Sequence, residues 1–178
     1  FNSQMSIIHI GIIREGKTPP DFRVPLSPEQ CLKLEKQYQN VKVTVQTSPI
    51  RCFSDEKYAE LGLNVQEDLS HCDILLGVKE VPKEQLIPNK TYLFFSHTKK
   101  EQTYNQRLFH AMMDKNISLI DYECLEHEDG QRLIGFGFFA GIVGAHNGIM
   151  AYGNRTKTFN LKRVAASKDF RQLIHTYF

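Results

Sequence analysis

Short apolar runs separated by helical patterns constrain this chain more than any other feature of its sequence. Residues 7–13 read Ile-Ile-His-Ile-Gly-Ile-Ile, a continuous apolar stretch typical of a strand that is covered on both faces. Further strands are predicted at residues 41–45, 72–78, 91–96 and 117–121. Helices are predicted between them, at residues 28–38, 54–61 and 102–113. The alternation predicts an α/β domain with a mainly parallel sheet and helices on both faces.

The start of the first helix carries a clear local signal. Ser27 is a suitable N-cap, and Pro28 occupies the first helical position, where its missing N–H is not needed. Gln30 follows Ser27 at the third position and completes a capping box.

After residue 130 the pattern changes. Residues 132–137 are predicted as a short strand, and residues 138–152 as a helix followed by a loop over 154–159. Three glycines share one face of this helix: Gly141, Gly144 and Gly148. Each costs a helix roughly 1 kcal/mol relative to alanine, so close packing on that face is predicted. A last helix is expected to be capped by residues 167–169 and to end at Phe178.

The composition excludes several classes of protein. Hydrophobic residues make up 41% and charged residues 24% of the chain, as in ordinary soluble domains. The net charge of +2 is too small to indicate nucleic acid or an anionic membrane as the partner. No apolar run approaches the roughly 20 residues of a membrane span, and no signal peptide is recognisable. We therefore expect a cytoplasmic protein whose natural start is Met5, preceded by four added residues.

The four cysteines do not predict a metal site or a disulfide framework. They form no CxxC pair, and no histidine lies at zinc-ligand spacing from them. We expect reduced thiols.

Polar side chains at the ends of the predicted strands are the candidates for chemistry. Ligands of parallel sheets gather at the carboxyl ends of the strands. The candidates there are Arg23, Lys79, Glu80, His97 and Glu123. Arg23 offers a fork of donors that suits a carboxylate, and His97 titrates near neutral pH as a general acid or base should. Each has a structural alternative: an ion pair of Arg23 with Asp21 or Glu29, an ordinary turn lysine, a structural histidine and a solvated acid.

No complete glycine fingerprint for a dinucleotide is present. Residues 135–141 read Gly-Phe-Gly-Phe-Phe-Ala-Gly, but aromatic side chains fill the space where backbone must approach a pyrophosphate. We interpret this segment as the entry of a helix.

Several motifs occur in order along the chain. They are Glu15-Gly16-Lys17 with FRVPLSP at 22–28, VKEVP at 78–82, and FSH at 95–97. Together they resemble the opening domain of alanine dehydrogenases, of the transhydrogenase alpha subunit and of saccharopine dehydrogenases. Residues 122–145 are similar to the lysine-forming saccharopine dehydrogenases and lysine–ketoglutarate reductases, whereas alanine dehydrogenases carry a different sequence there.

The resemblance implies two Rossmann-like (flavodoxin-like) domains with an active site in the cleft between them. Residues 5–135 would form the substrate-binding domain. Residues 136–178 would form interdomain helices leading to a nucleotide-binding domain that this sequence lacks. Alone, the chain is expected to be inactive. The implied cofactor is NAD or NADP, and the implied partners are two small molecules, an amino acid and a keto acid.

The resemblance also implies roles for particular residues. Lys79 and His97 match the acid–base pair of the family, and Arg23 matches the arginine that holds a substrate carboxylate. Further polar residues match the lining of the cleft: Glu80, Glu123 and Arg132. Two alternatives remain open, an alanine dehydrogenase-like reductive amination of pyruvate and a non-catalytic carboxylate-binding or regulatory module. The glycine-faced helix also predicts possible homo-oligomers.

Overall fold

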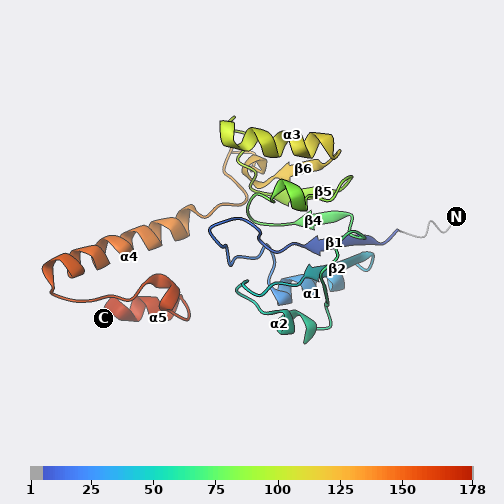
Figure 1. Ribbon diagram of the computed structural model, residues 1–178. Coiled ribbons are helices and arrows are strands. Elements are labelled where there is room, and N and C mark those ends of the chain that lie inside the picture. Colours follow the sequence, from blue (N-terminus) through green and yellow to red (C-terminus); the bar gives the residue numbers. More distant parts are fainter. Residues whose placement is uncertain (1–5, 178) are drawn as a thin grey trace. The chain divides into compact units, whose positions relative to one another are not determined.

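A single six-stranded sheet organises the first part of the molecule (Figure 1). The computed structural model describes residues 6–177, so the predicted start at Met5 lies outside the described residues. The chain divides into two compact units, one up to Leu133 and one from Ile134 onward. The strands are β1 (Ile8–Ile12), β2 (Val41–Gln46), β3 (Asn64–Gln66), β4 (Ile74–Leu76), β5 (Thr91–Phe94) and β6 (Ser118–Asp121).

The strand order is β3-β2-β1-β4-β5-β6, and every neighbouring pair is parallel. This is the order of a Rossmann fold, and the five strands other than β3 follow the flavodoxin order. The predicted Rossmann-like α/β class is therefore confirmed. The direction of strand addition reverses between β1 and β4, which makes the carboxyl ends of those two strands the expected place for a ligand.

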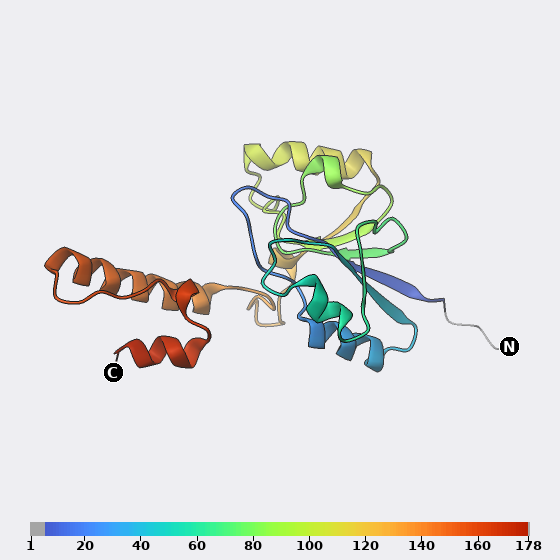
Figure 2. The ribbon, with the colours of Figure 1, turned by 60° about the horizontal axis from the view of Figure 1, so that its bottom comes forward.

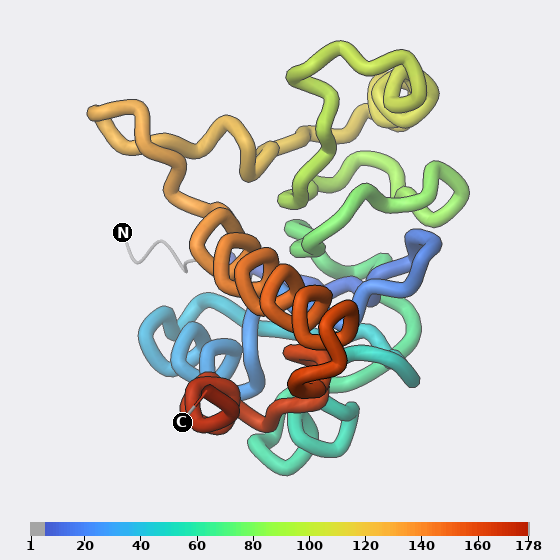
Figure 3. Tube along the Cα trace, turned by 90° about the vertical axis from the view of Figure 1, so that its left-hand side faces the viewer, coloured from blue at the N-terminus to red at the C-terminus, as the bar shows by residue number. Residues whose placement is uncertain are grey.

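Two hydrophobic cores lie on opposite faces of this sheet. Successive side chains of a strand point to opposite faces, and Leu75 and Leu76 of β4 belong to different cores. The Leu75 core is closed by Leu108 and Met112 of α3, and the other core by Cys31 of α1 with a tyrosine of α2. The helices accordingly lie on both sides of the sheet (Figure 3).

The helices of the first unit agree with the predicted positions but are shorter. They are α1 (Pro28–Gln37), α2 (Asp55–Ala59) and α3 (Gln106–Asp114). The capping box of α1 is present, since the Ser27 side chain accepts from the Gln30 backbone and the Gln30 side chain accepts from the Ser27 backbone. α3 follows a 3₁₀ turn at Thr103–Asn105, where a continuous helix from residue 102 was expected.

The second unit consists of α4 (Gly137–Thr156) and α5 (Phe170–Ile174), and the chain returns beside α4 after that helix ends (Figure 2). His146 of α4 is buried, with one ring nitrogen 2.8 Å from the Lys162 carbonyl oxygen and the other in contact with the Tyr177 hydroxyl. Asp169 caps α5 as predicted by accepting from the Gln172 backbone. The last helix was expected to run to the end of the chain, but α5 ends at Ile174 and a 3₁₀ turn follows at His175–Tyr177; Phe178 lies outside the described residues.

Two predictions around this unit are wrong. The strand expected at 132–137 is absent, because among the described residues this stretch pairs only through an isolated bridge between Glu126 and Arg132. A turn with Gly130 in the left-handed region forms this bridge, which does not extend the sheet. α4 also continues to Thr156, into the stretch expected as a loop.

Candidate functional site

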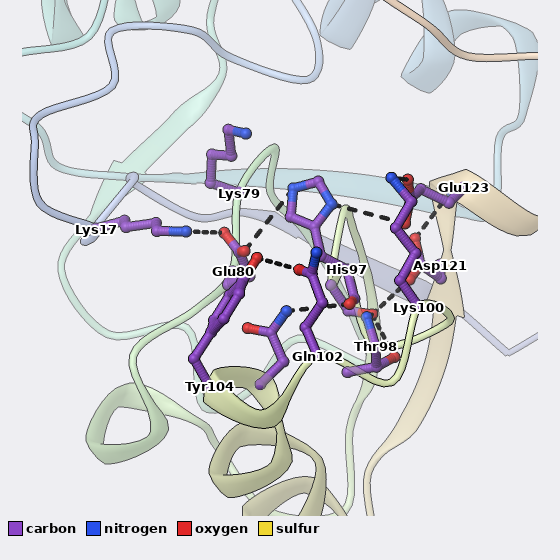
Figure 4. Close-up of polar contacts among 12 residues, drawn as sticks. Lys17, Lys79, Glu80, His97, Thr98, Lys100, Gln102, Tyr104, Asp121 and Glu123 are labelled. Carbon is purple, nitrogen blue, oxygen red and sulfur yellow. Dashed lines mark hydrogen bonds and ion pairs between the residues drawn. The ribbon is translucent and has the colours of Figure 1, made fainter.

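The carboxyl ends of β4, β5 and β6 bring three of the predicted site residues together. His97 lies between Glu80 and Glu123 (Figure 4). Its Nε2 atom is 3.8 Å from Oε1 of Glu80, and its Nδ1 atom is 3.6 Å from Oε2 of Glu123. The three residues follow three successive strands of the sheet, so parallel pairing alone is enough to gather them.

The two carboxylates are buried to an unusual degree. Their side chains are 8% exposed at Glu80 and 3% exposed at Glu123. The oxygens that face His97 have no hydrogen-bond partner among the described residues. Buried acceptors without partners are costly, so their retention at this point favours a functional role. They can stabilise positive charge on the imidazole or accept N–H groups of a ligand.

Cations surround the outer oxygens of the same carboxylates. Lys17 Nζ lies 2.6 Å from Glu80 Oε2. The Arg132 guanidinium and the Lys100 ammonium lie 3.4 Å and 3.6 Å from Glu123 Oε1. The prediction included Arg132 but missed the two lysines. Lys17 belongs to one of the motifs quoted above, which could have identified it, whereas Lys100 follows another lysine in a polar loop and carries no such signal.

Lys79 lies beside this group without joining it. In Figure 4 its side chain points away from Glu80, and no contact to its ammonium is drawn. Its ammonium makes no hydrogen bond or ion pair with the described residues. Its backbone, in contrast, is held by Glu15, in the loop that follows β1: the Glu15 carboxylate accepts the N–H groups of Val78 at 2.7 Å and of Lys79 at 2.8 Å. The backbone of Lys79 is therefore held in place, whereas its ammonium group has no hydrogen-bond or ion-pair partner among the described residues.

The Glu15 carboxyl that accepts these two backbone N–H groups has a shifted pKa. Burial raises the pKa of the Glu15 carboxyl above its ordinary value, and the two backbone hydrogen bonds oppose that rise without cancelling it. The charge of Asp21 adds to the rise, and the charge of Arg23 opposes it.

Arg23 is placed differently from the other predicted residues. Its guanidinium forms a close pair with Asp21, with Nη2 at 2.5 Å from Oδ2 and Nε at 2.9 Å from Oδ1. This pairing lowers the pKa of Asp21, chiefly through the side-chain hydrogen bond. The ion pair with Asp21 is the structural alternative considered for Arg23, and its role toward a substrate carboxylate stays a prediction.

The backbone at His97 is itself unusual. Its φ angle is 54°, in the left-handed region, which costs a residue other than glycine about 1–2 kcal/mol. Asn105 holds this conformation, since its side-chain amide donates to the His97 carbonyl at 3.0 Å. Phe95 stacks on the ring at a centroid distance of 6.4 Å.

Two of the four cysteines are buried and unreactive, whereas Cys52 and Cys124 are exposed. All four are free thiols, and Cys31 and Cys72 are buried. Burial raises the pKa of Cys31 to about 12 and that of Cys72 to about 11, so both stay protonated and unreactive near neutral pH. Within residues 6–177, no group of three or more potential ligand side chains could hold a metal ion. No helix in that range could cross a membrane.

The glycine-rich stretch at 135–141 lacks the strand-to-helix setting of a dinucleotide fingerprint. This stretch does not follow a strand, and α4 begins within it. Its aromatic residues are exposed on either side of the glycines, with Phe138 at 74%. The interpretation of this segment as a helix entry is supported, and no residue of this chain is assigned to the nucleotide.

A family model for the N-terminal domain of alanine dehydrogenase/PNT matches residues 11–143. The chain belongs to this family. Within it, the chain is 37% identical over 142 residues to a mitochondrial alpha-aminoadipic semialdehyde synthase of Rattus norvegicus, a match that covers 80% of the chain and 15% of that protein. It is also 33% identical over 150 residues to the alpha-aminoadipic semialdehyde synthase of Arabidopsis thaliana, a match that covers 82% of the chain and 14% of that protein.

A third relative is the NAD(+), L-lysine-forming saccharopine dehydrogenase of Yarrowia lipolytica. It is 28% identical over 170 residues, which cover 91% of the chain and 46% of that protein. This member of the family therefore spans less than half the length of each of these relatives. Solved structures also share its fold. An L-alanine dehydrogenase matches with a TM-score of 0.58 at 21% sequence identity, over 70% of this chain and 35% of that one. The Sinorhizobium meliloti transhydrogenase matches with a TM-score of 0.56 at 19% sequence identity, over 67% of this chain and 36% of that one.

Proposed function

We propose that this chain is the substrate-binding domain of an NAD(P)-dependent amino-acid oxidoreductase of the saccharopine dehydrogenase type. The observation that carries the proposal is His97, held between two buried carboxylates at the carboxyl edge of the sheet, with Lys79 on the neighbouring strand end. Sequence similarity to saccharopine dehydrogenases and aminoadipic semialdehyde synthases supports the choice of reaction.

The proposed reaction needs several proton transfers. The amine of lysine condenses with the carbonyl of 2-oxoglutarate and releases water, and reduction of the resulting imine gives a secondary amine. Bound NAD(P)H supplies the hydride for that reduction, and the imine nitrogen gains a proton. Removal of a proton from the attacking ammonium and delivery of protons to the departing oxygen need groups that titrate near neutral pH.

We assign these transfers to Lys79 and His97. The unpaired oxygens of Glu80 and Glu123 stabilise the imidazolium when His97 carries a proton. The free ammonium of Lys79 lies where it can exchange a proton with a substrate without first breaking an ion pair.

Two arginines are assigned to substrate carboxylates. Arg132 is 46% exposed at its side chain and contacts Glu123 through one guanidinium nitrogen at 3.4 Å, so donors remain for a ligand. Arg23 would serve a second carboxylate after exchange of its Asp21 contact. Fixing both ends of the substrate places its reacting carbon, where misplacement is expensive in rate.

The test is turnover by the full-length parent protein. NADH and NADPH oxidation is followed with lysine plus 2-oxoglutarate, and separately with pyruvate plus ammonia. The variants are Lys79→Met and His97→Gln, and matched controls are Lys33→Met and His110→Gln, which change the same residue types at exposed positions. We expect turnover with lysine, and a loss of about 10²–10⁴-fold in kcat in the two site variants alone.

Other outcomes would redirect the proposal. Turnover with pyruvate in place of lysine would move the assignment to an alanine dehydrogenase type while keeping the site. If neither pair reacts and the parent binds no nicotinamide nucleotide, a non-catalytic carboxylate-binding module becomes the better account.

A further inference from the structure

Asp121, the last residue of β6, joins the two turns that carry His97 and Glu123. One carboxylate oxygen, Oδ2, accepts a hydrogen bond from the hydroxyl of Ser96, the residue before His97. The other, Oδ1, accepts the backbone N–H of Glu123 at 2.8 Å. Figure 4 shows Asp121 next to Glu123, with contacts drawn from its carboxylate. The side chain is buried, so a single group fixes both turns from inside the fold.

The polarity of this link is set by the serine hydroxyl. Ser96 is fully buried and has one proton and two lone pairs to satisfy. Its Oγ atom accepts the backbone N–H of Thr98 at 3.1 Å and lies 2.7 Å from the Thr98 hydroxyl. Donation to Asp121 uses the only proton, which leaves Thr98 as donor in both of its contacts. Position 121 must therefore present an acceptor to Ser96.

His97 depends on this turn for its place. Its backbone is in the left-handed region, and its ring lies 3.6–3.8 Å from one oxygen of each flanking carboxylate. We infer that Asp121 is a positioning residue, which acts through Ser96 on His97 and directly on Glu123 and so keeps the imidazole between its two carboxylates. The effect on turnover rests on the proposed function, whereas the effect on the position of the ring does not.

The variant that tests this inference is Asp121→Asn. The amide keeps the size of the side chain and can still accept from Glu123, but it then presents N–H to Ser96, which can accept it only if the hydrogen bond between the Ser96 and Thr98 hydroxyls reverses its direction. Asp68→Asn is the matched control, because Asp68 also accepts from a backbone N–H two residues later and from a serine hydroxyl, at an exposed loop.

In the parent enzyme, we expect Asp121→Asn to lower kcat by about ten- to a hundredfold and to change the shape of the pH–rate profile. KM should change by less than about threefold, because Asp121 touches no substrate. Ser96→Ala should reproduce the effect. The double variant should be no worse than the more severe single one, since both changes break one link. Additive losses, or an unchanged kcat and pH–rate profile, would overturn the inference.

A second measurement does not need turnover. The ring resonances of His97 in this chain are identified by their loss in His97→Gln. They should shift in Asp121→Asn and in Ser96→Ala but not in Asp68→Asn. If the wild-type parent has no activity, the proposed function fails and this measurement alone decides. Unmoved His97 resonances in both folded variants would refute the positioning role.

Discussion

The edge of the sheet and the helix α4 depart from the usual rules of protein structure in opposite directions. The sheet edge buries charge, with Glu80 and Glu123 almost fully enclosed beside His97. α4 exposes apolar surface, and no Asp, Glu, Lys or Arg occurs from residue 133 to residue 154. Buried charge is tolerated where it serves binding or chemistry, and contiguous exposed apolar surface marks an interaction site. We therefore propose chemistry for the first region and association for the second.

The largest effect on stability is expected at Glu15, whose carboxylate holds the turn after β4. Glu15→Ala leaves the backbone N–H groups of Val78 and Lys79 without their acceptor. At about 1–3 kcal/mol for each of the two unsatisfied groups, we expect a loss of about 2–6 kcal/mol in the free energy of unfolding. Urea denaturation followed by circular dichroism measures it. Glu84→Ala, at an exposed carboxylate, is the control and should stay within about 0.5 kcal/mol of the wild type.

The same residue gives a pH dependence with a definite sign. The pKa of Glu15 is raised in the folded chain above its ordinary value of 4.5. Its contribution to stability is therefore fully present below that value and is lost as the pH rises through the folded pKa. The Glu15→Gln side chain cannot ionise. Raising the pH from about 4 to about 7 should therefore lower the stability of the wild type relative to that of the variant. A difference that stays constant over this range would contradict the raised pKa.

Two glycines of α4 differ in the space that is available for a side chain. A Cβ atom at Gly153 would lie 2.7 Å from the backbone oxygen of Phe159, whereas at Gly148 it would meet nothing within 4 Å. We expect Gly153→Ala to destabilise the helix by about 1–3 kcal/mol through overpacking. Gly148→Ala should stabilise it by about 0.5–1 kcal/mol, since the space is open.

Amide hydrogen exchange along α4 measures both glycine effects separately from the sheet. Faster exchange in Gly148→Ala would mean that a surface packs closely on that face in solution, as the sequence analysis expected. The same substitution in the full-length parent shows whether a further part of that protein occupies the face.

The positions of the site residues followed from the sequence because they depend on backbone topology. Apolar runs located the strands, and parallel strands place their carboxyl ends at one edge, so His97 and Glu123 were both expected at that edge. The contacts of Lys17 and Lys100 could not be predicted in the same way. They depend on long side chains reaching across loops, and sequence patterns do not specify where such side chains end.

Elements without a strong apolar pattern were also missed or misplaced. β3 has three residues, Asn-Val-Gln, and is defined by pairing with β2 rather than by its own hydrophobicity. Residues 132–137 contain apolar residues but have no strand beside them beyond one bridge, so β-propensity gave a wrong strand there. In both cases tertiary contacts decide the structure.

The smallest expected effect concerns association through α4. Phe138 is 74% exposed in a helix that carries no charged residue before Arg155, so we expect this chain to self-associate through that surface. Phe138→Ser should weaken association by about tenfold, because burial of part of one aromatic ring contributes about 1–2 kcal/mol. Met113→Ser, at a 63% exposed residue of α3, is the control and should leave association unchanged. Sedimentation velocity over a range of concentrations measures both. A wild-type chain that stays monomeric at high concentration would show that exposed apolar surface on α4 is not enough for pairing, and the association assigned to this region would then require a different partner.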